Sequence, residues 1–397
     1  MKSAVGRFGL ALAALALALA LAAGLAGSGP SRTGDARVTA RLNGLVRHAS
    51  AARAAAARPS ASAQPRGSPF PLLPVGGPGN LAPGSDPSAL PGDVLIADED
   101  NNRLLLIDPF GHVRWQFPPS GSLPGGGLFG PPDDAFFSPD GKEIVATQEM
   151  YDTVSVLNIA SGSVIRSYGH PDTPGSAPDY FSHPDDAMQL PGGDLLLADI
   201  INCRILLLAP GPWQVVRHLG NSASCYHDPP ISFGSPNGVF PLTDGHYLVT
   251  EINGDWVDEM SLTGHVYWSA HPPGVAYPSD ANEVSRGRYI VADYSSPGQI
   301  VIFNRAGRAL WRFRPGGRNA LNHPSLALPL PNGNILVNDD YNHRVIVIDP
   351  STNRIVWQYG HYGVPGSAPG YLNNPDGVDM APPESLLTRR AASIGRP

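Results

Sequence analysis

The amino-acid sequence predicts an all-β chain folded as a six-bladed β-propeller with four-stranded antiparallel blades. One observation is a recurring segment that opens with proline and continues as a short strand, a Gly-containing turn and a second apolar strand. Another is that the copies recur at intervals of roughly 40–50 residues, which is the length of one propeller blade. The six anchor prolines are Pro132, Pro184, Pro236, Pro278, Pro324 and Pro375.

The last repeat indicates how the ring closes. Pro375 begins a good inner strand, "PDGVDMA", and the blade-like pattern then stops. The three missing strands are found at the other end, in residues 90–117, "LPGDVLIADEDNNRLLLIDPFGHVRWQF". One C-terminal strand and three N-terminal strands are therefore expected to share a blade. Such closure leaves only short, protected sheet edges.

The composition divides the chain into four regions. In residues 1–26, Lys2 and Arg7 precede an apolar Leu/Ala run, which predicts a signal peptide or an uncleaved N-terminal anchor. Residues 27–89 are rich in Ala, Pro, Ser and Arg and predict a disordered tether. The propeller is expected over 90–383, followed by a disordered tail over 384–397. The protein is thus predicted to be secreted or extracytoplasmic, and anchored to a membrane if the first segment is retained.

Charge is distributed unevenly along the chain. Residues 1–90 contain nine Lys or Arg and two Asp, whereas the formal net charge of the whole chain is −7. The predicted propeller is therefore strongly acidic and would repel phosphate backbones, which excludes nucleic acid as its main partner. It suits cations and basic peptides instead. The basic tether suits an anionic membrane surface.

Several segments resemble known propeller families over residues 90–383. The turns "ADEDNNRLLLID", "ADIINCRILLLA" and "NDDYNHRVIVID", and the linker "YGHPDTPGSAPDYFSHPDDA", resemble the NHL repeat. A Trp near the end of the fourth strand is more similar to quinoprotein-type or bacterial arylsulfotransferase-type propellers; it occurs as Trp115, Trp268, Trp311 and Trp357. These resemblances imply a propeller and no single activity.

The positions after the anchor prolines carry a candidate metal site on the propeller axis. The first position after each proline is Asp133, Asp185, Asn237, Ser279, Ser325 or Asp376, and the next position adds Asp134, Asp186 and Asp280. Oxygen ligands favour calcium over zinc. The predicted ligands are Asp133, Asp185, Asn237, Asp280 and Asp376. The alternative is that these side chains accept hydrogen bonds from backbone N–H groups where the strands begin. The segment "SPNGVF" also resembles gluconolactonase-like and strictosidine-synthase-like propellers, which implies an axial metal.

Two histidines, His183 and His323, directly precede anchor prolines in opposite blades and are the candidate catalytic residues. Each is interpreted as a general base or anion ligand, or as a structural hydrogen-bonding residue. The NHL-type amidating lyase places zinc-binding histidines just after the anchor proline, where this chain has Asp, Asn and Ser. That zinc site is therefore not implied here.

Other polar residues are predicted to be structural. Arg103, Arg204 and Arg344 are expected to pair with Asp98, Asp199 and Asp339 within their blades. The two cysteines, Cys203 and Cys225, are predicted to form a disulfide, because an even count in an exported protein favours pairing. Two buried free thiols are the alternative.

Two hypotheses of function follow. The first is a binding or scaffold propeller that recognises a protein, peptide, glycan or small molecule through the face that carries the inter-blade loops. The second is an enzyme at the channel mouth: a lactone hydrolase, lyase or aryl sulfotransferase that uses the axial cation and His183 or His323. No sequence motif names a reaction.

Overall fold

The structure is a computed structural model that describes residues 73, 79–119, 123 and 129–382. The chain divides into units 1–51 and 52–397, and every described residue belongs to the second. The predicted signal peptide or anchor, most of the predicted tether and the predicted tail lie outside the described residues. The described helices are three-residue 3₁₀ turns, so none of them is long enough to cross a membrane.

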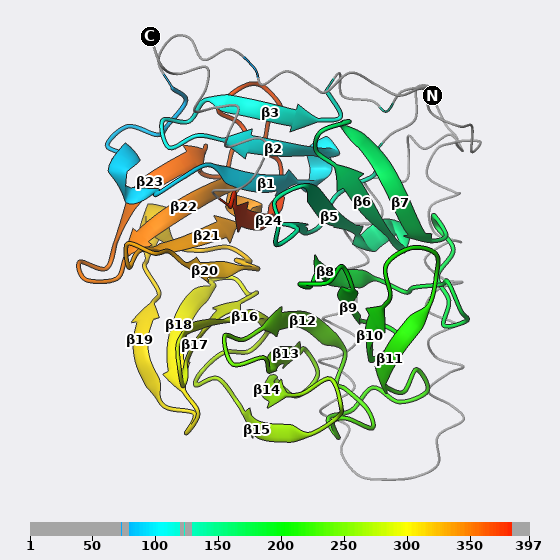
Figure 1. Cartoon of the computed structure of the whole chain (residues 1–397). Helices are drawn as coiled ribbons and strands as arrows, with labels where there is room; N and C mark the ends of the chain where they lie inside the picture. The colour runs from blue at the N-terminus through cyan, green and yellow to red at the C-terminus, as the bar shows by residue number, and fades with distance from the viewer. Residues whose placement is uncertain (1–72, 74–78, 120–122, 124–128, 383–397) are drawn as a thin grey trace, which may run out of the picture. The chain divides into compact units, whose positions relative to one another are not determined.

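Six four-stranded antiparallel sheets surround a central axis, which confirms the predicted propeller (Figure 1). The inner strands of neighbouring blades are in contact from β24 through β4, β8, β12 and β16 to β20, and β21 contacts β24. From inner to outer strand, the blades are β24–β1–β2–β3 (Pro375–Met380, Val94–Asp98, Arg103–Ile107, Val113–Phe117), β4–β7 (Ala135–Phe137, Glu143–Gln148, Thr153–Asn158, Ser163–Gly169), β8–β11 (Pro184–Gln189, Leu195–Asp199, Arg204–Leu208, Val215–Gly220), β12–β15 (Pro236–Pro241, Tyr247–Glu251, Trp256–Met260, Val266–Ala270), β16–β19 (Pro278–Ser285, Arg288–Asp293, Gln299–Asn304, Ala309–Phe313) and β20–β23 (Ala327–Pro329, Ile335–Asp339, Arg344–Asp349, Arg354–Gly360).

The first of these blades closes the ring as the sequence predicts. β24 pairs antiparallel with β1, and Val94 lies opposite Met380. Because each blade packs between two others, both faces of its middle strands are buried, and β1 and β9 are buried at every residue. This explains why these strands are continuous apolar runs rather than alternating ones. One core cluster, for example, joins Leu95 and Leu104 of the shared blade to Ile144 of the β4–β7 blade.

The described chain begins earlier than the predicted propeller boundary. Residues 79–89, assigned to the tether, lie along the outer strand β23 instead. Leu81 bridges Tyr359, and the N–H groups of Ala82 and Asp86 donate to backbone carbonyls of β23 at 3.0 and 2.8 Å. The 3₁₀ turn η1 (Pro87–Ala89) then leads toward β1. The reason is physical: an outermost strand presents unpaired backbone groups that a preceding segment can satisfy. The propeller therefore includes residues that precede the predicted boundary at residue 90, and the N–H of Leu73 likewise donates to the Arg114 carbonyl of β3 at 2.9 Å.

The predicted Arg–Asp pairs are confirmed in three blades. The Nε atoms of Arg103, Arg204 and Arg344 lie 2.6, 2.7 and 2.7 Å from an Oδ atom of Asp98, Asp199 and Asp339. In each pair the Asp ends the second strand and the Arg begins the third, directly opposite it in register. The guanidinium groups also donate to carbonyls of the preceding linker, such as Ser176 and Tyr180 for Arg204. These pairs therefore fasten linkers to blades.

Candidate functional site

In several blades, the two residues after the anchor proline both point toward the axis. The reason is a β-bulge at the start of the inner strand. Asp133 N–H donates to the Thr147 carbonyl, while Thr147 N–H donates to the Asp134 carbonyl, so one residue of β5 pairs with two before β4. A register shift occurs at the start of β8, β12, β16 and β24 as well. A regular strand would point successive side chains to opposite faces. The bulge therefore explains why both positions after the anchor proline join one cluster.

The axial carboxylates form three overlapping groups, each with oxygen atoms within 4.8 Å of one another. The groups are Glu99, Asp133 and Asp376; Asp133, Asp134 and Asp185; and Asp134, Asp186 and Asp280. Asp133 and Asp134 each belong to two groups and connect all three. We call the seven residues of these groups, together with Glu149 and Asp340, the axial acid cluster.

The predicted ligands are only partly brought together. Asp133 shares one group with Asp185 and another with Asp376, whereas Asp280 lies in the third. Asn237 is hydrogen-bonded to two residues at the start of the next blade. Its Nδ2 donates to Ser279 Oγ at 3.2 Å, and its Oδ1 accepts from Tyr277 at 3.5 Å. The amide therefore lies beside Ser279, which holds the same position after the anchor proline of the next blade.

Sequence reasoning missed Glu99, Glu149 and Asp340. Each directly follows the last residue of a second strand, namely β1, β5 or β21. The loop after the second strand lies on the same face of a blade as the entry to the first, so these positions approach the anchor prolines. An alignment of the six strand ends would have shown acidic residues at this position in three adjacent blades.

The nine carboxyl groups of the axial acid cluster are buried without a cationic partner. Burial is the largest cause that raises each pKa above its ordinary value, and neighbouring carboxylates raise the pKa further at eight of the nine. None of the nine forms an ion pair with Lys, Arg or His in the described part of the chain. The cluster therefore concentrates negative charge that the described residues do not neutralise.

Several oxygen atoms of this cluster accept no hydrogen bond from a nitrogen or hydroxyl donor, although carboxyl groups such as Asp186 and Asp280 hydrogen-bond to each other when one of them is protonated. These oxygen atoms are Asp134 Oδ1, Glu149 Oε1, Asp186 Oδ1, Asp280 Oδ1 and Asp340 Oδ2. The amide of Asn374 adds another, because its Nδ2 donates to Glu99 Oε2 while its buried Oδ1 has no partner. An unsatisfied buried polar group costs about 1–3 kcal/mol. Oxygen atoms without donors are suited to a hard divalent cation, for which carboxylate and amide oxygens are the preferred ligands.

The same position after the second strand is apolar in the other three blades. Ile200, Ile252 and Tyr294 occupy it there and pack with Tyr277 in one cluster. These three blades are consecutive around the ring, as are the three that carry Glu99, Glu149 and Asp340. The ring of six residues therefore has an acidic half and an apolar half.

The two predicted catalytic histidines have separate surroundings. His183 Nδ1 lies 3.8 Å from Asp152 Oδ1, and its side chain is about a quarter exposed. The ring of His323 lies between Tyr294 and Tyr341, with centroids 4.9 and 4.4 Å away. Neither histidine belongs to a group of axial carboxylates.

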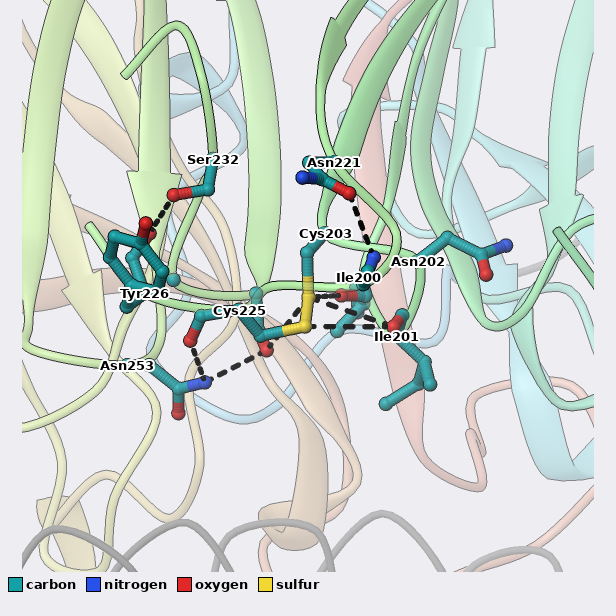
Figure 2. Close-up of a disulfide and its surroundings, with 12 residues drawn as sticks. Ile200, Ile201, Asn202, Cys203, Asn221, Cys225, Tyr226, Ser232 and Asn253 are labelled. Carbon is teal, nitrogen blue, oxygen red and sulfur yellow. Dashed lines mark hydrogen bonds between the residues drawn. A yellow bond between two sulfur atoms is a disulfide. The ribbon is translucent and has the colours of Figure 1, made fainter. Parts of the chain in front are cut away.

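Cys203 and Cys225 are joined by a disulfide, shown in Figure 2. Cys203 lies in the turn between β9 and β10, and Cys225 lies 22 residues later in the linker before β12, with 5.3 Å between the Cα atoms. The bond fixes this linker against the β8–β11 blade.

Comparison with known proteins supports the fold and extends no further. No protein-family model matches the chain, and no curated protein matches it. A solved Bacteroides caccae protein of unknown function is 16% identical, with a TM-score of 0.51, over 72% of this chain and 97% of its own. A chain of the nidogen/laminin complex is 12% identical, with a TM-score of 0.51, over 73% and 98%. Virginiamycin B lyase from Staphylococcus aureus is 16% identical, with a TM-score of 0.49, over 72% and 84%.

Proposed function

We propose that this protein is an exported ligand-binding propeller that holds a calcium ion on its axis and presents it to a partner. The observation that carries the proposal is the axial acid cluster: nine buried carboxyl groups with no cationic side chain among them. Taking that many charges from water without compensation is costly. A divalent cation supplies the compensation, and calcium accepts six to eight oxygen ligands in flexible geometry.

Asp133 and Asp134 are the best candidates for direct ligands, because each belongs to two of the three groups. Glu99, Asp185 and Asp376 complete the set around Asp133. The partner would be a protein, peptide, glycan or small molecule that offers oxygen atoms toward the acidic half of the ring.

Calcium binding is tested by thermal unfolding of the full chain after dialysis against a chelator. At a calcium concentration 100 times the dissociation constant, the native state should gain about 2.7 kcal/mol. Asp133→Asn should abolish this gain. Asp140→Asn, which changes an exposed carboxylate paired with Lys142, should leave the gain intact. An unchanged melting temperature of the unmodified protein in millimolar calcium would refute the proposal.

Catalysis at the same face is the second candidate, and the pairing of His183 with Asp152 favours it. A carboxylate near an imidazole favours its protonated form, which supports its action in proton transfer. With an axial cation to polarise a carbonyl, this arrangement suits a lactone hydrolase or lyase. Turnover of a lactone panel that His183→Ala abolishes while calcium stabilisation persists would favour the enzyme over the binding protein.

A further inference from the structure

The β12–β15 blade lacks the Arg–Asp pair found in three other blades. Glu251 ends its second strand and lies opposite Trp256, the first residue of its third strand. In the neighbouring β8–β11 blade, the same two places hold Asp199 and Arg204. The buried carboxylate is therefore kept in this blade, while the guanidinium that would neutralise it is replaced by an indole.

This blade also buries a second carboxylate on the same face. Asp258 follows Trp256 by two residues, so both side chains lie on one side of β14. Asp258 and Glu251 are both fully buried. The third strands of the three blades with an Arg–Asp pair carry Leu105, Leu206 and Ile346 at the corresponding place. Two buried carboxylates thus lie together where the other blades have one carboxylate and one cation.

The described donors satisfy these two carboxylates incompletely. Ser269 Oγ donates to Asp258 Oδ1 at 2.5 Å, and the N–H of Gly234 donates to Glu251 Oε2. Asp258 Oδ2 is buried and accepts no hydrogen bond from a described nitrogen or hydroxyl donor, and the Asp258 and Glu251 carboxyl groups hydrogen-bond to each other when one of them is protonated. That atom is an unused ligand in a site that is short of positive charge.

His227 contributes a nitrogen atom to the same site. Its Nδ1 lies 3.0 Å from Glu251 Oε1 and 3.9 Å from Asp258 Oδ2. The imidazole stacks on Trp256 with 4.1 Å between the ring centroids and an interplanar angle of 9°. About a fifth of the His227 side chain is exposed, so the site can be reached from solvent.

The linker that carries His227 is held in place on both sides of the histidine. Cys225 is bonded to Cys203, and its carbonyl accepts from Asn253 Nδ2 at 3.4 Å. The Tyr226 carbonyl accepts from Ser232 Oγ at 2.8 Å, and Figure 2 shows these residues gathered around the disulfide. The position of the imidazole is therefore set by the fold before any ion arrives.

We propose that His227, Glu251 and Asp258 form a binding site for a divalent transition-metal ion, zinc in particular, distinct from the axial acid cluster. The three ligand atoms lie within 4.8 Å of one another, close enough for small shifts to bring them around one ion. One imidazole nitrogen with two carboxylate oxygens suits zinc, whereas calcium prefers oxygen alone. Three protein ligands leave a fourth tetrahedral position for water or for a side chain of a partner.

The test is calorimetric titration of zinc into the full chain in millimolar calcium, so that calcium competes for oxygen-only sites. The unmodified protein should bind one zinc ion per chain at this site. His227→Ala and Asp258→Asn should each weaken binding at least about tenfold, since even the loss of an outer-shell partner costs 10–100-fold. The control is His361→Ala, which removes an exposed imidazole tilted against the ring of Tyr371, and this variant should bind zinc as the unmodified protein does.

Two further measurements separate loss of the zinc site from loss of folding and identify the zinc ligands. The far-ultraviolet circular dichroism and thermal melt of each variant establish that it is folded, and His227→Ala, at a partly exposed linker residue, carries the test if Asp258→Asn fails to fold. X-ray absorption of the zinc complex should show one imidazole among nitrogen and oxygen ligands at about 2.0–2.2 Å. Equal zinc affinity in folded His227→Ala, or no binding by the unmodified protein at millimolar zinc, would overturn the proposal.

Discussion

Buried carboxylates occur in two regions of this propeller, and their surroundings differ. Asp199, at the end of a second strand, accepts from Arg204 Nε at 2.7 Å, from Asn202 Nδ2 at 2.9 Å and from the Ser182 N–H at 2.8 Å. In the axial acid cluster, Asp134 Oδ1 accepts nothing, and the nearest charged groups are other carboxylates. Both regions are equally buried.

The difference separates carboxylates whose charge the fold neutralises from carboxylates that it leaves without cationic partners. Each Arg–Asp pair is completed by donors within the same chain, so it stabilises the fold and needs no further ligand. The axial acid cluster concentrates like charges and leaves oxygen atoms without donors, which destabilises the fold unless protons or cations are taken up. The axial region is therefore the one at which an added ion changes the energy of the protein most.

Deletion of residues 375–397 should change the stability of the protein most, because it removes β24. That strand supplies both the inner edge of the shared blade and the axial Asp376. The shortened chain should aggregate or lose its cooperative thermal transition, followed by circular dichroism. Deletion of residues 384–397 alone should leave the transition unchanged, and equal tolerance of both deletions would contradict ring closure by β24.

Arg204→Met should have the next largest effect. It leaves Asp199 buried without its cation, and breaking a buried pair in this way costs about 3–5 kcal/mol. Urea denaturation should show the loss in the free energy of unfolding. Arg217→Met, which changes an exposed residue of the same blade, serves as the control. A loss below about 1 kcal/mol would mean that Arg204 is not needed to stabilise the buried carboxylate.

The pH dependence should distinguish the two regions. Burial raises the pKa of Asp98 and Asp199 to about 6, despite the adjacent arginines, and raises the axial pKa values well above their usual range. A raised pKa in the folded state means that the native protein binds protons more tightly than the unfolded chain. The stability that these groups contribute is therefore fully present below about pH 4 and is lost as the pH rises through their folded pKa values.

Between pH 6 and pH 8 Asp379 and Glu251 should contribute to this fall, because burial raises their pKa values to about 7, and the axial carboxyls add to it because their pKa values are raised as well. In chelator, the melting temperature should decrease over this interval, with a loss of about 1–3 kcal/mol. Millimolar calcium should reduce the slope, because the ion replaces the protons. Identical slopes with and without calcium would show that the axial carboxyls bind no calcium.

The smallest expected effect, and the sharpest test, is that the same Asp-to-Asn change should alter the free energy of unfolding with opposite signs in the two regions. In chelator at pH 8, Asp134→Asn removes one like charge from the cluster and should stabilise the protein by about 1 kcal/mol. Asp199→Asn at the same pH should destabilise it, because it leaves Arg204 without its carboxylate partner. Denaturant midpoints of the two variants measure both signs, and a destabilised Asp134→Asn would place Asp134 with the structural carboxylates.

Local sequence patterns determined the blades and their internal pairs. The Pro-anchored repeat, the split last unit and the Asp-to-Arg spacing each depend on residues close together in one blade or on a repeat copied along the chain. For that reason the six blades, the shared blade and the pairing of Arg103, Arg204 and Arg344 were predictable.

Only the tertiary structure decided which polar residues meet. The β-bulges bring Asp134 and Asp186 into the cluster, contrary to simple strand alternation, while Asn237 is hydrogen-bonded to Ser279 of the next blade. The course of a linker brings His227 to two carboxylates of a later blade. Such contacts depend on backbone irregularities and on chain segments that cross between blades, and neither leaves a periodic signal in the sequence.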